Sequence, residues 1–149
     1  MTTVDLRPGV RPAGALQHAW GRAPDYHALG TFSETWSFLE YFLERCVQAG
    51  GGEAACEQPL SLRLDALERL GGEAAALAAE ARALAHRRQA ALQDLARASL
   101  SRMGLGQFDA SAAPPTTEGD KALEVLHMRT CDLVRRAVLL LCALEKARA

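Results

Sequence analysis

Leucine and alanine recur at helical spacing through the middle of the chain, from Leu60 to Met103. The intervals between them alternate between three and four residues, which places them on one face of an α-helix. A stripe of this kind is stable only when it packs against other helices, so the sequence predicts an all-α bundle with coiled-coil-like packing. This stripe, called the seam below, comprises Leu67, Leu70, Ala74, Leu77, Ala81 and Leu84 and continues to Leu92 and Leu95.

The composition favours the same fold class. Ile, a β-branched residue that strands favour, is absent, as is Asn, a poor helix former, and the chain is dominated by Ala and Leu. With 149 residues, of which 49% are hydrophobic and 23% charged, the chain has the size and polarity of one globular domain. We therefore expect a single domain, residues 1–149, built as a small bundle of three to four main helices.

The N-terminal part combines turn signals with a helix start. Residues 1–30 contain three prolines and four glycines and are expected to form an irregular arm. Thr31 and Glu34 have the spacing of a capping box, in which each side chain bonds a backbone N–H of the first helical turn. The pattern predicts an aromatic helix over 31–48.

The rest of the chain predicts two further helical segments. A long or kinked helix is expected over 60–103, and the adjacent Gly71 and Gly72 favour a break within it. Glycines and two adjacent prolines predict a loop over 104–117. A C-terminal helix is expected over 118–147.

Charge and targeting signals narrow the possible partners. The net charge is −1, divided as −3 over residues 1–60, +2 over 61–103 and 0 over 104–149. A role in nucleic-acid binding would therefore need a local basic patch. We expect no membrane span and no secretory signal, and therefore a cytoplasmic location. The four cysteines form no CxxC pair and, without a signal, are expected to be reduced thiols.

Aromatic residues are concentrated near the first predicted helix, and seven of the eight lie between Trp20 and Phe42. A single amphipathic helix needs only one apolar stripe, yet this one carries two. Either the arm folds back over the second stripe, or that stripe forms a surface for a partner. The first stripe contains Phe32, Trp36 and Phe42, and the second contains Phe38 and Tyr41.

Two other features suggest protein contacts. Arg88 interrupts the seam, where an unpaired charge would be costly, so it needs a partner such as Glu40 or Glu44 or marks a surface that recognises an acidic partner. From Val138 through Leu139 to Cys142 the last helix is apolar on every side. Such a segment is either central to the bundle or shared with a second copy in a homo-oligomer.

A metal-binding or redox role is a first alternative. Glu124, His127 and Cys131 are separated by three and four residues, so their side chains share one helical face and could bind one ion. A second set of ligands, as found in di-iron bundles, is missing. The same residues are also consistent with a partly exposed helix face that carries an incidental histidine.

A nucleoprotein subunit is a second alternative. Arg82, Arg87 and Arg97 lie on the polar side of the long helix, where they could follow a phosphate backbone. A solvated outer face explains the same arginines, because neither interleaved aromatics nor lysine clusters accompany them.

No catalytic motif, phosphate-binding loop or cofactor motif occurs in the sequence. We therefore expect a non-catalytic interaction protein without a cofactor: an adaptor, a chaperone or a small structural subunit of a larger complex. The candidate partner-binding residues are Trp36, Phe38, Tyr41, Arg88, Val138 and Leu139.

Overall fold

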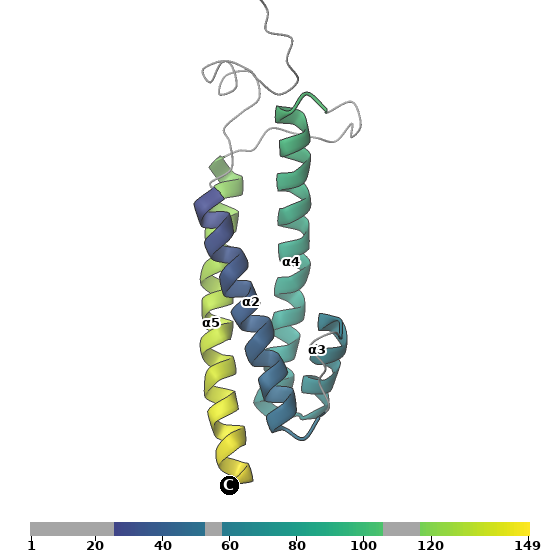
Figure 1. The fold of residues 1–149 in the computed structure, drawn as a ribbon, viewed down its shortest axis with the longest axis vertical. Coiled ribbons are helices and arrows are strands. Elements are labelled where there is room, and N and C mark those ends of the chain that lie inside the picture. Colours follow the sequence, from purple (N-terminus) through teal and green to yellow (C-terminus); the bar gives the residue numbers. More distant parts are fainter. Residues whose placement is uncertain (1–25, 53–57, 106–116) are drawn as a thin grey trace, which may run out of the picture.

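The computed structural model of this chain describes residues 26–52, 58–105 and 117–149. These residues form helices and their connecting turns with no strand among them, which confirms the all-α fold. Residues 1–25 of the expected arm and 106–116 of the expected loop lie outside the described part. The helices are α2 (Tyr26–Ala49), α3 (Leu60–Arg69), α4 (Gly72–Arg102) and α5 (Thr117–Arg148) (Figure 1).

The three long helices lie side by side along the long axis of the bundle. Helices α2 and α5 run parallel to each other and form the largest helix–helix interface, whereas α4 runs antiparallel to both (Figure 1). The short α3 packs mainly against the N-terminal half of α4 and also contacts α2. Helix α5 therefore contacts both other long helices and holds the bundle together.

The core is formed by one apolar face from each long helix. The predicted seam contributes four buried residues from α4, and the first aromatic stripe of α2 faces them. Apolar residues of α5 complete the core at the spacing expected for a buried helix face. The buried residues include Ala74, Leu77, Ala81 and Leu84 of α4, Phe32, Trp36, Leu39 and Leu43 of α2, and Leu123, Leu126, Leu133 and Ala137 of α5.

Helix α2 begins at Tyr26, so the predicted start at residue 31 is wrong. Thr31 does not cap the helix, because its hydroxyl donates a hydrogen bond of 2.9 Å to the carbonyl of His27, one turn earlier. Thr35 bonds the carbonyl of Thr31 in the same way, at 3.0 Å. A threonine hydroxyl inside a helix can bond the carbonyl four residues earlier. The spacing of a capping box does not distinguish such a threonine from one that caps the helix.

The two adjacent glycines do break the predicted long helix. Gly71 and Gly72 have φ angles of +72° and +55°, in the left-handed region that favours glycine. The chain reverses there, and α3 folds back against α4. Leu67 and Ala74, on either side of the break, consequently lie in the same core. Leu70 is 37% exposed, so the prediction that it belongs to the seam is wrong.

Helix α5 spans Thr117–Arg148, close to the predicted range of 118–147. Within the described ranges, no helix combines the length and the apolar character that crossing a bilayer requires.

Candidate functional site

The outer side of α2 carries an exposed aromatic surface. Phe38 and Tyr41 are 49% and 55% exposed, whereas Phe42 is half-buried against the core. The rings of Tyr41 and Phe42 meet edge to face, with centroids 5.2 Å apart and an interplanar angle of 79°. We call these three residues the aromatic surface. Whether the N-terminal arm covers it, as one prediction held, concerns residues outside the described part.

Trp36 and Arg88 come together between α2 and α4. The Arg88 guanidinium carbon lies 4.9 Å from the centroid of the Trp36 ring, a cation–π arrangement. Trp36 is only 3% exposed, and its Nε1 donates a hydrogen bond of 3.1 Å to Glu40. The partner of Arg88 is therefore the indole ring, and the expected ion pair with Glu40 or Glu44 does not form.

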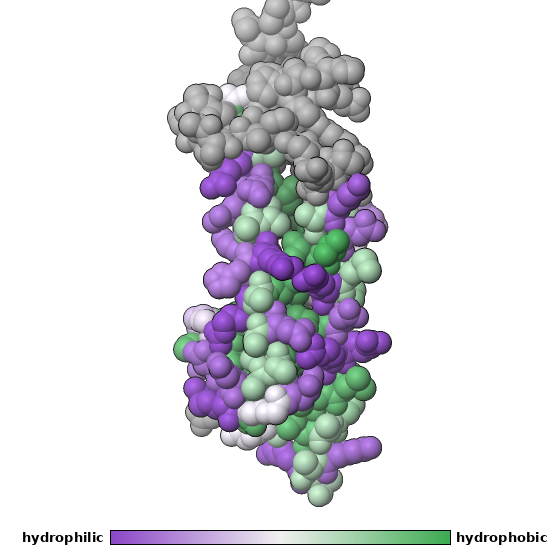
Figure 2. Space-filling model, turned by 180° about the vertical axis from the view of Figure 1, so that it is seen from behind, coloured by the Kyte–Doolittle hydropathy of each residue, from purple (hydrophilic) through white to green (hydrophobic). Residues whose placement is uncertain are grey.

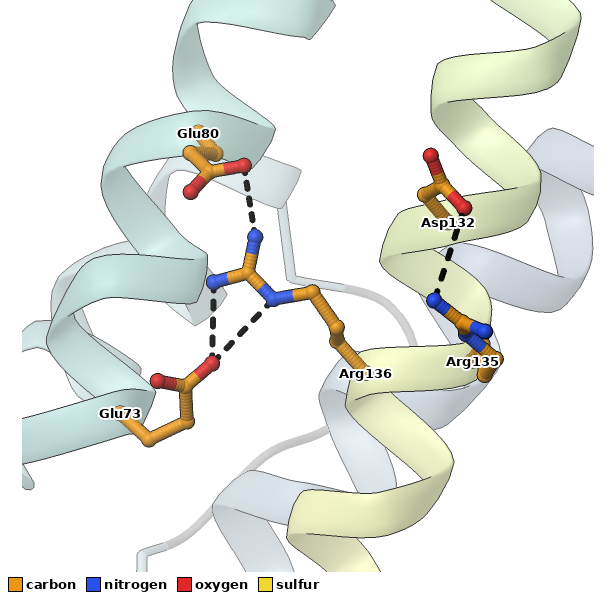
Figure 3. A network of polar contacts seen from close by, with 5 residues as sticks. All are labelled: Glu73, Glu80, Asp132, Arg135 and Arg136. Carbon is orange, nitrogen blue, oxygen red and sulfur yellow. Dashed lines mark hydrogen bonds and ion pairs between the residues drawn. The ribbon is translucent and has the colours of Figure 1, made fainter.

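Arg136 of α5 links the facing sides of α5 and α4. Its Nη1 lies 2.7 Å from Glu80, and its Nη2 and Nε lie 2.9 and 3.2 Å from Glu73 (Figure 3). The hydrogen bonds with Glu80 and then Glu73 raise the pKa of Arg136 above its ordinary value. The next residue, Arg135, pairs with Asp132 along α5 and does not reach α4.

A groove lies between α4 and α5 next to this network. Its volume is about 380 Å³, and its walls carry charged side chains around a short apolar floor. The α4 wall is formed by Glu80, Ala83, Leu84 and Arg87, and the α5 wall by Arg129, Asp132, Leu133, Arg135 and Arg136. The two leucines are 4% exposed, and six of the nine residues named above are charged, although carbon atoms form more of the accessible lining than polar atoms do.

The Arg136 bridge is expected to stabilise the packing of α5 on α4. In a double-mutant cycle of Arg136→Gln and Glu80→Gln, we expect a coupling energy of about 0.5–1 kcal/mol, because both carboxylates are more than half exposed and solvent weakens the pair. Urea unfolding of the four proteins in the cycle measures this coupling energy. The coupling energy should decrease in high salt, which screens the ion pair. Arg135→Gln, one residue away, should change stability by no more than about 0.5 kcal/mol. A coupling near zero would contradict the bridge.

The three candidate metal ligands do not form a metal site. His127 and Cys131 lie 3.7 Å apart, but no group of three His, Cys, Asp or Glu side chains within the described residues is placed to hold an ion. Glu124 points to solvent. The helical spacing correctly brings His127 and Cys131 together, whereas a third ligand is lacking.

The arginines of the nucleic-acid alternative are placed in different surroundings. Arg82 bridges back to Asp65 and Glu68 of α3, at 3.0 and 3.3 Å. Arg97 pairs with Asp94 on its own helix at 3.5 Å. Arg87 alone of the three lines the groove. The predicted stripe is therefore not a continuous set of free cations, because carboxylates neutralise two of its members.

The apolar segment of α5 has one buried and one exposed side. Leu141 is 9% exposed and faces the core, whereas Leu139 is 64% exposed and Val138 is half-buried. Figure 2 shows hydrophobic residues gathered over the C-terminal part of the molecule at the lower right, with hydrophilic residues around them. A central place in this bundle therefore accounts for the apolar residues on the buried side of the segment, such as Leu141, but not for the exposed Leu139.

The sequence interpretation named Arg87 but missed the other charged residues of the groove and the bridge that Arg136 forms beside it. Glu73 and Glu80 are seven residues apart and so share one face of α4, which was the available signal for a cation opposite them. Their partner, Arg136, lies 63 and 56 residues further along the chain. Spacing within one helix cannot identify such a partner, and the same holds for Arg129, which lines the same groove as Arg87 only after folding.

No protein-family model matches the sequence, and no curated protein or solved structure shows significant similarity to it. Function is therefore inferred from the residues and their geometry alone.

Proposed function

We propose that the protein is a non-catalytic helical interaction protein: an adaptor, a chaperone or a small structural subunit of a larger complex. The observation that carries this proposal is the aromatic surface. The core already receives Phe32 and Trp36 from α2, yet the same helix leaves Phe38 and Tyr41 about half exposed.

Such side chains are suited to binding another protein. Tyrosine and phenylalanine are enriched at protein interfaces because each buries a large rigid area at a small cost in side-chain entropy. The contact of Trp36 with Arg88 on the inner side joins α2 to α4, and leaves the outer aromatics outside the core. We infer that the partner contributes the apolar face of a helix, packed along α2. Leu139 offers a separate apolar contact, which fits a second copy of the chain.

The proposal is tested with a Phe38→Ser/Tyr41→Ser double variant. Tagged wild-type protein and the variant are used to capture partners, and any protein lost with the variant is purified and titrated against both by calorimetry. We expect the variant to weaken that complex by about a hundredfold, since two central aromatics typically contribute more than 1 kcal/mol each. Circular dichroism and urea unfolding should show the fold unchanged.

The matched control replaces two exposed apolar residues elsewhere. Leu62→Ser/Met128→Ser alters side chains that are 48% and 62% exposed on α3 and α5. This variant should retain the partner with its affinity changed by less than about threefold. Light scattering of the wild type shows whether the partner is a second copy. A partner that binds both variants equally, or a monomer with no partner, would count against the aromatic surface.

A further inference from the structure

The groove between α4 and α5 has an uneven distribution of charge. Among the described residues, its lining holds four arginines but only two carboxylates. Arg136 is neutralised by Glu73 and Glu80, and Arg135 lies within 3.9 Å of Asp132. The remaining two, Arg87 on α4 and Arg129 on α5, are exposed and form no ion pair within the described part of the chain.

This arrangement is unusual for the molecule. Most of the described arginines have a partner, as Arg45 does in Glu145 and Arg82 does in α3. The two groove arginines instead stand on opposite walls beside two other cations. The repulsion among these positively charged arginines decreases when an anion enters the groove. The groove is therefore electrostatically complementary to a negatively charged ligand.

We propose that this groove binds an acidic peptide segment of a protein partner, with one carboxylate at Arg87 and another at Arg129. The inference rests on the proposed role in protein interaction and names a second surface for it. A volume of about 380 Å³ accommodates a few side chains. Guanidinium groups bind carboxylates through paired N–H donors, which favours this geometry.

The acids of the groove favour a peptide over a nucleic acid. Glu80 and Asp132 interrupt the positive charge of the lining, so the groove does not offer the continuous basic track that a phosphate backbone follows. A peptide, in contrast, presents backbone N–H donors as well as carboxylates, and these donors can bond to such acids. The lining residues that the structure describes also include no aromatic side chain on which bases could stack.

The test uses a fluorescein-labelled peptide of alternating Glu and Ala residues, titrated with the full chain at low ionic strength and followed by fluorescence anisotropy. We expect saturable binding that weakens as salt is added. Arg87→Gln/Arg129→Gln should weaken it about tenfold, the effect of losing two solvent-exposed ion pairs. The Phe38→Ser/Tyr41→Ser variant should bind the peptide as the wild type does, which separates this site from the aromatic surface.

A charge-matched control decides between a site and a general attraction. Arg69→Gln/Lys146→Gln also removes two positive charges, but from exposed positions outside the groove. It should change the affinity by less than about twofold. The proposal is overturned if the peptide does not bind, if both double variants lose affinity equally, or if single-stranded DNA of equal charge binds more tightly than the peptide.

Discussion

Replacing Phe32 with alanine should lower the free energy of unfolding by about 3–5 kcal/mol, the largest effect that we expect from a single substitution. The side chain is completely buried between the long helices, with its ring centroid 6.4 Å from that of Trp36. Alanine would leave a cavity that the surrounding helices can fill only in part. Urea unfolding followed by circular dichroism measures the change.

Phe38→Ala on the same helix is the matched control. It removes the same atoms, but Phe38 is 49% exposed, so the free energy of unfolding should change by about 0.5 kcal/mol. Equal losses for the two variants would show that both aromatic stripes of α2 are buried, and that the aromatic surface is not available to a partner.

Alkylation of Cys46 in the folded protein should be at least about a hundredfold slower than that of an ordinary exposed thiol. Burial, assisted by the negative charge of Glu145, raises the pKa of Cys46 to about 11, and the thiolate is the reactive form. The side chain is also fully buried, and its Sγ donates a hydrogen bond of 3.2 Å to the carbonyl of Ala137. Iodoacetamide labelling at pH 8, resolved by residue with mass spectrometry, compares it with the exposed Cys131 and Cys142.

The pH dependence of the free energy of unfolding provides a second test of the buried Cys46 thiol. Folding favours the neutral thiol of Cys46, so its contribution to stability is retained below the ordinary thiol pKa and lost as the pH rises toward about 11. A Cys46→Ala variant should lack this alkaline loss. Urea should make all thiols react alike. If Cys46 in the folded chain reacts as fast as Cys131, then α2 and α5 are not packed as described.

The sequence pattern predicted the fold where a residue's position on its own helix decided its burial. Leu77, Ala81 and Leu84 are buried because their spacing places them on one face, and this spacing is readable without a partner. The start of α2 was missed because the Thr31 hydroxyl can bond either the N–H groups that follow or the carbonyl of His27 that precedes it. Sequence spacing is the same in both cases.

The candidate site was predictable only in part, for a related reason. The excess of aromatics on one helix indicated a second stripe at Phe38 and Tyr41, but it left open whether the arm or a partner covers that stripe. The partner of Arg88 could not be chosen among neighbours on α2, because Trp36 and Glu40 are one turn apart and both face the same region. The groove depends on which helices become neighbours, and no local pattern contains that information.

The parallel packing of α2 on α5 also affects when this chain can fold during synthesis. Cys46 contacts Ala137, 91 residues later, and Arg45 pairs with Glu145, 100 residues later. Such distant contacts slow folding, because a long intervening segment must be ordered before they form. On a ribosome, the part of α2 that packs on α5 stays uncovered until the last helix has emerged. A nascent chain of this protein therefore exposes apolar surface of α2 during most of its translation, and such surface favours aggregation.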